Sequence, residues 1–299
     1  MFFEQLLNGL TLGCMYALIA LGYTLIFGVI QVIFFAQGEL SMVSAFISIG
    51  VFSFFSHFTS VESPWILLPS LFMASILGTS LIGVAAERIA IRPIRNSHRT
   101  KQLLTSLGMS IILQNIVFLT ISSGNVAFPP LISPKVLSIG SFTFSSIQLF
   151  IILSSFLFML LLDIFVRNTR LGLAMRATAE SHKLARLMGI NINKTIMLTF
   201  IIGSSLASIS GVMMGLYDGV AKYDMGFAPG IKAFTAAILG GIGNVIGGML
   251  GGILIGLVES FGAGYISAEY KDFFAFIILI IILVLKPSGI LGERISKID

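Results

Sequence analysis

The feature that most constrains this chain is a series of apolar stretches, most of them as long as a membrane-spanning helix. They fall at roughly 6–30, 40–58, 65–87, 102–122, 148–166, 195–217, 231–261 and 273–286. A helix needs about 20 apolar residues to cross the hydrocarbon core of a bilayer. Only 10% of the 299 residues are charged, less than half the ~25% of an ordinary soluble domain. The sequence therefore predicts an all-α, polytopic transmembrane helix bundle with about eight membrane-embedded segments.

Basic residues gather in two short segments between these stretches. No Lys or Arg precedes Arg88, whereas residues 88–101 hold five and residues 167–194 hold six of the 18 in the chain. Cytoplasmic loops carry such an excess, so we place both segments inside. Counting spans from them puts the N-terminus outside, and the basic tail after Lys286 agrees with a C-terminus inside. A nucleic-acid surface is not expected, because no aromatic-interleaved motif accompanies the charges.

The stretch at 231–261 is too long for one simple crossing. As a single helix it would extend about 46 Å at 1.5 Å per residue, and it would leave the basic tail outside. Glycine pairs at its centre weaken a helix and permit a break. We therefore expect broken or re-entrant half-helices here, a tilted single helix being the alternative. Broken backbone is tolerated in a membrane where it is buried in protein or lines a cavity, which makes four residues candidates for a translocation pathway: Gly240, Gly241, Gly243 and Asn244.

The glycines that follow this break recur every four residues, as in membrane helices that pack closely. We expect Gly241 and Gly243 to tolerate alanine poorly, because a break uses their backbone freedom. Gly256 is expected to tolerate alanine better, as a residue inside a regular helix.

A polar turn separates the first two apolar stretches, where Gln37, Gly38 and Glu39 follow Phe35-Ala36. Polar groups at such a position need partners. An interfacial turn with a hydrated carboxylate fits the pattern, and so does a functional turn that lines the conduit. The three residues are further candidates for the translocation pathway.

The basic segment at 167–194 contains a candidate amphipathic helix. If residues 177–188 are helical, small and apolar side chains form one stripe on it, with Gly189 as the helix stop. Such a helix either lies on the membrane surface or docks in the groove of a partner, and its short length and small side chains favour the groove. The stripe and the residues beside it are Arg176, Ala177, Glu180, Ser181, Leu184, Ala185, Arg186 and Met188.

No pattern in the chain supports catalysis, a metal site or a cofactor. The three histidines are scattered over different loops, and neither a nucleophile–histidine nor a paired-carboxylate arrangement is visible. No G-x-x-x-x-G-K-[ST] motif occurs, so the chain has no nucleotide site of this kind. Only three carboxylates, Glu39, Asp163 and Glu259, lie in or beside spans, and proton- or sodium-coupled carriers usually need more ionisable groups within the membrane than that.

A series of segments spread over nearly the whole chain forms one specific pattern, and its most specific block is Lys232 to Gly243. The other segments are Asn8-Gly9, Tyr16 to Tyr23, Ala36 to Glu39, Glu87-Arg88, Arg92-Pro93, Arg176 to Asn191, Glu269 to Asp272 and Pro287 to Gly292. On these segments the chain resembles the membrane permease subunit of bacterial branched-chain amino acid (LIV-type) ABC importers. The family commonly has Asn and His where this chain has Phe34 and Gln37.

The resemblance implies that the whole chain, 1–299, is one ABC-importer transmembrane domain in the bacterial inner membrane. Its partners would be a second, homologous permease, two ATPase subunits that bind ATP and Mg²⁺, and a periplasmic binding protein. The segment from Arg176 to Asn191 would be the loop that docks on the ATPase. The expected cargo is a branched-chain amino acid. Urea or a short amide is the alternative within the family, and a stand-alone channel or secondary carrier is the alternative outside it.

Overall fold

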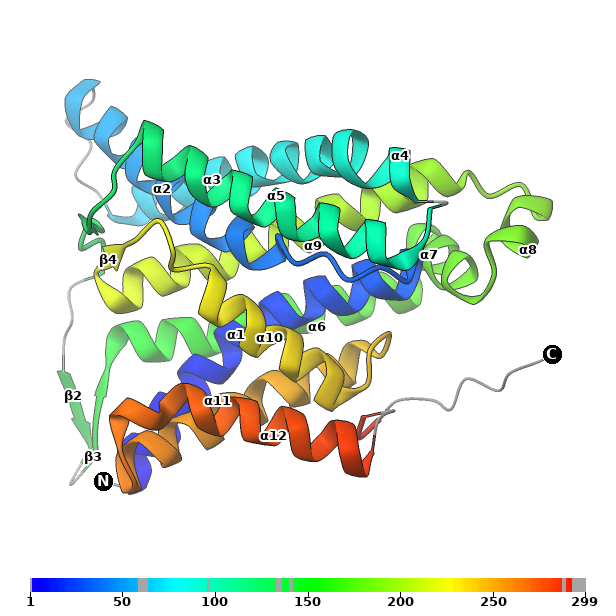
Figure 1. The fold of residues 1–299 in the computed structure, drawn as a ribbon. Helices are drawn as coiled ribbons and strands as arrows, with labels where there is room; N and C mark the ends of the chain where they lie inside the picture. The colour runs from blue at the N-terminus through cyan, green and yellow to red at the C-terminus, as the bar shows by residue number, and fades with distance from the viewer. Residues whose placement is uncertain are drawn as a thin grey trace.

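The computed structural model describes residues 2–58, 64–95, 97–132, 136–139, 142–286 and 289–291. Long helices run side by side through it in both directions (Figure 1). Seven of the described helices are long and apolar enough to cross a membrane, which confirms the predicted polytopic all-α bundle. They are α1 (Phe2–Ile30), α2 (Gln37–Phe58), α3 (Pro64–Ala86) with its continuation through η1 (Glu87–Ile91) and α4 (Arg92–Ile94), α5 (Arg99–Thr120), α6 (Ser146–Asn168), α9 (Ile192–Asp218) and α11 (Val245–Tyr265).

The remaining elements are short. Two apolar helices fall below the length of a full crossing, α10 (Phe227–Gly240) and α12 (Lys271–Leu285). Between α6 and α9 lie α7 (Arg170–Glu180) and α8 (His182–Leu187), and η2 (Ala268–Tyr270) precedes α12. Two small antiparallel sheets, which the sequence did not predict, sit in connections: β1 (Val126–Ala127) with β4 (Val220–Ala221), and β2 (Val136–Ile139) with β3 (Phe142–Ser145).

The two ends of the bundle differ in kind. One end carries α4, α7 and α8, and we call it the α8 end; the other carries the strands, and we call it the hairpin end (Figure 1). Both basic segments lie at the α8 end. The chain begins at the hairpin end, and α12 runs toward the α8 end (Figure 1), as the predicted number of crossings requires. The tail residues Arg294 and Lys297 lie outside the described residues.

Helix α1 forms the centre of the bundle, and 89% of its most apolar window is buried. Glycines let it approach α11 closely: a methyl group built on Gly13 would lie 2.7 Å from Cα of Ile253. One built on Gly256 would collide with the backbone of Gly13. The expectation that Gly256 tolerates alanine is therefore wrong, since this glycine is a point of backbone contact between two helices.

The break in the 231–261 stretch is confirmed. Helix α10 ends at Gly240, Gly241 and Gly243 take φ angles of +100° and +98°, and α11 begins at Val245. Such angles favour glycine. The two helices are not two half-spans, however, because α11 has 21 residues and α10 has 14. The turn is also not at mid-membrane: a methyl group on Gly28, in the last turn of α1, would lie 3.6 Å from Cα of Gly243.

A second re-entrant element precedes α2. After α1 ends at Ile30, residues 31–36 run back into the bundle without regular structure, and α2 starts in its interior (Figure 1). Gln31, with φ of +55°, turns the chain at this point. The turn at Gln37 to Glu39 is therefore buried within the bundle, and the interpretation as a hydrated interfacial turn is wrong.

The predicted continuous helix over 177–188 is also wrong, because the chain breaks at Ser181 into α7 and α8. Ser181 has φ of −159°, and its hydroxyl accepts a hydrogen bond from N–H of Leu184 at 3.3 Å, which caps α8. The helix stop at Gly189 is confirmed, with φ of +81°. There N–H of Gly189 donates to Arg186 and N–H of Ile190 to Ala185, the hydrogen-bond pattern of a Schellman motif.

Candidate functional site

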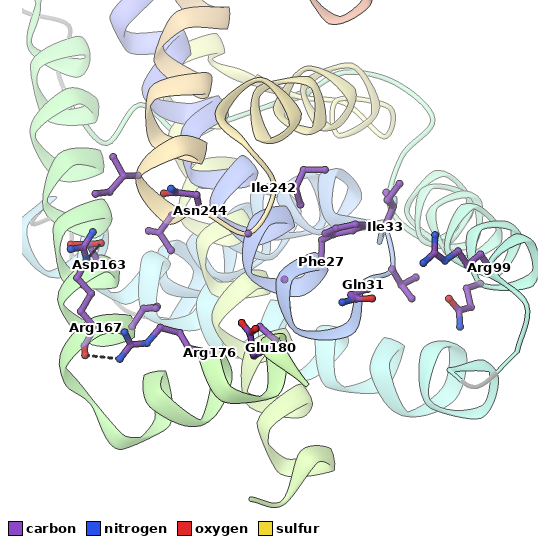
Figure 2. A pocket seen from close by; sticks show the side chains of 18 of the residues that line it. Phe27, Gln31, Ile33, Arg99, Asp163, Arg167, Arg176, Glu180, Ile242 and Asn244 are labelled. Carbon is purple, nitrogen blue, oxygen red and sulfur yellow. Dashed lines mark hydrogen bonds and ion pairs between the residues drawn. The ribbon is translucent and has the colours of Figure 1, made fainter. Parts of the chain in front are cut away.

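A cavity of about 1000 Å³ opens at the α8 end between the end of α1, the start of α5, the end of α6, α7 and the α10–α11 turn. Figure 2 shows the turn residues Ile242 and Asn244 on one side of it and Phe27, Gln31 and Ile33 beside them. We call this cavity the vestibule. Gly243 lines it together with Asn244, so two of the four predicted pathway residues at the break do face a cavity.

Charged side chains also line the vestibule, with Asp163 on the side of Asn244 and Arg99 on the side of Ile33 (Figure 2). Arg167 pairs with Asp163 one helical turn earlier, at 2.8 Å, and Arg176 donates to the carbonyl oxygen of Arg167 at 3.1 Å. Glu180 and Arg99 also line the cavity. The vestibule thus combines apolar side chains with side chains of both charges, a lining that suits a small zwitterion or a polar solute.

Asn244 itself is committed to the architecture of the turn. Its Oδ1 accepts from N–H of Gly247 at 3.1 Å and caps α11, while its Nδ2 donates to the carbonyl oxygen of Leu291 at 3.1 Å. The segment after α12 completes the bracing, since N–H of Ile290 and of Leu291 donate to the last carbonyl groups of α10, on Leu239 and Gly240. Helix ends leave such carbonyl groups unpaired. Asn244 therefore shapes the wall of the vestibule, and each polar atom of its side chain already makes one hydrogen bond.

Gln37 and Glu39, two residues apart, face different helices. Nε2 of Gln37 donates to the carbonyl oxygen of Gly203 in α9 at 2.7 Å and packs against Gly22 of α1. This side chain braces three helices. Glu39 lies against α5 and α10, where its Oε1 accepts from the Ser110 hydroxyl at 3.3 Å. Of these two side chains, only that of Glu39 faces the start of α10.

Gly38 brings α2 and α10 into contact. Both helices start inside the bundle, and we call them the two re-entrant helices. A methyl group built on it would lie 2.7 Å from Cα of Gly230 and would collide with the carbonyl oxygen of Gly226. The first turns of α2 and α10 therefore meet inside the bundle, next to Glu39. A methyl group on Gly226 would lie 2.8 Å from Oε2 of Glu39.

A closed apolar cleft lies between the vestibule and this contact. Tyr23, Phe234 and Ala237 line it together with three residues that also line the vestibule, Phe27, Ile33 and Ile242. The ring of Phe234 lies 5.7 Å from Tyr23 and 5.8 Å from Phe35. These aromatic rings close the vestibule at its inner end.

Helix α8 projects beyond the ends of the spans (Figure 1) and presents apolar side chains there. Leu184, Leu187 and Met188 are 60%, 76% and 82% exposed, whereas Ala185 is buried. The predicted stripe is thus corrected: Ala185 faces the protein, and Leu187 joins the exposed face. His182 fixes the helix to the end of α1, since its Nε2 lies 2.7 Å from the carbonyl oxygen of Val29.

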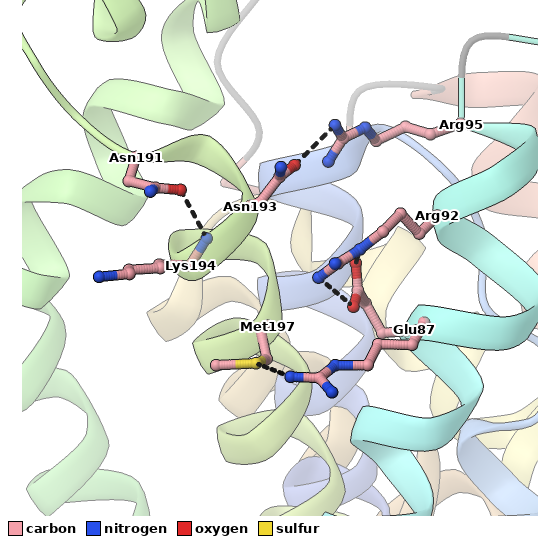
Figure 3. A network of polar contacts seen from close by, with 8 residues as sticks. Glu87, Arg92, Arg95, Asn191, Asn193, Lys194 and Met197 are labelled. Carbon is pink, nitrogen blue, oxygen red and sulfur yellow. Dashed lines mark hydrogen bonds and ion pairs between the residues drawn. The ribbon is translucent and has the colours of Figure 1, made fainter.

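A polar network braces this end of the bundle (Figure 3). The buried carboxylate of Glu87 accepts two hydrogen bonds from Arg92, at 3.1 and 2.9 Å. The π-helical turn η1 makes this pair possible, because its hydrogen bonds join residues five apart. Arg95 then donates to Oδ1 of Asn193 at 2.9 Å, which links the end of α3 and α4 to the start of α9, directly after α8.

The sequence did not lead us to predict one buried ion network. Nζ of Lys232 in α10 lies 2.6 Å from Oε1 of Glu259 in α11 and 2.6 Å from Oδ1 of Asp272 in α12, the latter without hydrogen-bond geometry. It also lies 5.6 Å from the centre of the Tyr16 ring. Lys232 and Glu259 are both nearly inaccessible. The signal was present in the sequence, as a lysine and a glutamate within one apolar stretch.

A polytopic bundle with two re-entrant helices, a vestibule at one end and an exposed apolar helix beside it is a membrane permease. Among the residues that the structure describes, no group of three or more His, Cys, Asp or Glu side chains is placed to hold a metal ion. No solved structure is significantly similar to the chain.

Sequence comparisons define the family. Residues 5–283 match the family model described as branched-chain amino acid transport system / permease component. The chain is 43% identical to the high-affinity branched-chain amino acid transport system permease protein LivH of Escherichia coli and to BraD of Pseudomonas aeruginosa, over 98% of its own length and 96% of theirs. It is 27% identical to a probable LivH of Methanocaldococcus jannaschii, over 94% of this chain and 90% of that protein. The chain belongs to this permease family.

Proposed function

We propose that the chain is the permease subunit of an ATP-driven importer that moves leucine, isoleucine and valine across the bacterial inner membrane. In this proposal a periplasmic binding protein delivers the amino acid, a second homologous permease completes the pathway, and two ATPase subunits hydrolyse ATP with Mg²⁺. In this proposal the chain itself is a transport subunit, and its partners supply the ATP hydrolysis. The relatives named as branched-chain amino acid permeases, matched over nearly the full chain, support the substrate.

The single observation that carries the role of an ATPase-driven subunit is the exposed face of α8. Three large apolar side chains are exposed beyond the ends of the spans, while the opposite face of the helix is anchored by Ala185 and His182. A helix so fixed and so exposed suits a groove in a partner protein. Because α8 projects away from the apolar spans (Figure 1), a position on the membrane surface is disfavoured.

The orientation in the membrane forms part of the proposal. Both basic segments lie at the α8 end, and cytoplasmic loops carry such charge. The N-terminus would then be periplasmic and the end of α12 cytoplasmic. Cysteines placed at Phe2 and at Lys286 test this with a membrane-impermeant thiol reagent, since the native Cys14 is buried. Labelling at residue 286 in intact cells, with residue 2 protected, would show the opposite orientation and contradict this part of the proposal.

The deciding experiment for the cargo uses the complete complex in proteoliposomes. Uptake of labelled leucine is compared with uptake of labelled urea, with and without the cognate binding protein and with and without ATP. We expect leucine uptake that needs both additions. Urea uptake in its place would show an amide importer, and leucine uptake that needs neither the binding protein nor ATP would show a carrier or channel.

A further inference from the structure

The least satisfied charged group described inside the bundle is the carboxylate of Glu39. The residue is 1% exposed. Its Oε1 receives one long hydrogen bond from Ser110, and its Oε2 has no partner. A carboxylate has about four acceptor sites, and burying one without a counter-charge is costly. Among the described residues, no cationic side chain pairs with it.

The position of Glu39 is where a pathway through this chain would pass. It lies at the contact of the two re-entrant helices, with Oε2 against Gly226 of α10. One turn further along α10, a methyl group on Gly230 would lie 3.6 Å from the Tyr23 hydroxyl. Tyr23 in turn lines the apolar cleft that leads to the vestibule. A buried carboxylate, an aromatic cluster and an open cavity therefore follow one another toward the α8 end.

This order of groups matches the chemistry of an aliphatic amino acid. An ammonium group pairs with a carboxylate through charge-assisted hydrogen bonds and is attracted to aromatic faces. An aliphatic side chain is stabilised by apolar surface such as that of Tyr23, Phe35 and Phe234. We propose that Glu39 is a substrate-binding residue of the permease, whose carboxylate pairs with the ammonium group of the passing amino acid while the aromatic cluster receives its side chain.

This inference rests on the proposed function, and its test separates the two. The complete complex, with the binding protein, is reconstituted with wild-type permease or with Glu39→Gln, which keeps the shape and the hydrogen bond to Ser110 but removes the charge. We expect the maximal rate of leucine uptake to fall by about tenfold or more. ATP hydrolysis stimulated by the binding protein should persist, so more ATP is consumed per leucine.

Two further variants distinguish charge from structure. Ser110→Ala removes only the hydrogen bond to Oε1 and should transport nearly as wild type. Glu39→Asp keeps the charge and should transport faster than Glu39→Gln. If the glutamine variant assembles poorly, the aspartate variant is compared with wild type instead. Uptake by Glu39→Gln within twofold of wild type, or equal rates in the aspartate and glutamine variants, would overturn the role of Glu39 and leave the proposed function intact. A wild-type complex that carries no leucine would overturn the proposed function itself.

Discussion

Replacing Lys232 by methionine should destabilise the permease more than any other change in its ion network. Lys232 and Glu259 are 4% and 3% exposed, and their charged atoms lie 2.6 Å apart. Removing one partner of a buried pair leaves the other charge without compensation, which costs about 3–5 kcal/mol. Asp272, in contrast, has a half-exposed side chain. Asp272→Asn should therefore cost no more than the ~1 kcal/mol of an exposed pair.

The decisive variant is the double substitution Lys232→Met with Glu259→Leu. Buried ion pairs replaced by apolar residues of similar volume often leave stability unchanged or raise it, so the double variant should be more stable than Lys232→Met alone. The measurement is the temperature at which half of the purified permease complex elutes as a monodisperse peak after heating. If Lys232→Met matches wild type, or if the double variant is less stable than the single one, the pair does not contribute as this structure implies.

Three other changes have outcomes that the structure sets. Leu184→Asp should leave the permease in the membrane but release the co-purifying ATPase, because desolvating the new carboxylate in a partner groove costs several kcal/mol. The control is Ile266→Asp, since Ile266 is also apolar and exposed but lies at the hairpin end. Gly256→Ala should cost about 1–3 kcal/mol through overpacking against α1, whereas Gly50→Ala, in open space within α2, should stabilise by up to ~1 kcal/mol; equal thermal stability of these two variants would contradict the contact. Ile290→Pro removes the N–H that caps α10 and should lower leucine uptake more than binding-protein-stimulated ATP hydrolysis, and unchanged uptake would show that the segment after α12 does not support the turn.

The glycine break was predictable because its cause is local. Only glycine adopts φ near +100° readily, so a run of glycines inside an overlong apolar stretch points to a turn. The depth of that turn was not predictable, since it depends on α10 starting inside the bundle. The same holds for residues 31–36, where Phe34 and Phe35 continue an apolar pattern through a segment that is not helical. Hydropathy alone does not separate a span from an extended segment buried in protein.

The break between α7 and α8 has a local signal in the sequence, Ser181. Its small side chain fits a helical stripe, but serine competes with the helix through its hydroxyl and favours N-cap positions. Reading it as a cap would have ended α7 at Glu180. The register of α8 would then have placed Leu187 with Leu184 and Met188 on the exposed face. The pairing of Lys232 with Glu259 is different in kind, because 27 residues separate them and only the hairpin of α10 and α11 brings them together.

Three features of this permease lie along α1: the ion network of Lys232, the contact between the two re-entrant helices, and the attachment of α8. Tyr16 of α1 lies beside the Lys232 network, Tyr23 beside the contact of the re-entrant helices, and Val29 accepts the hydrogen bond from His182 of α8. Helix α1 is unbroken over 29 residues and packs by glycine contacts against α11, so one continuous helix connects the three sites. The hydrogen bond between His182 and Val29 connects α8 to α1 next to Phe27 and Gly28 at the wall of the vestibule, and α8 also leads directly into α9. Because Tyr23 belongs to α1 and Phe234 to α10, a shift of α1 relative to α10 changes the distance between the two rings that line the aromatic cleft.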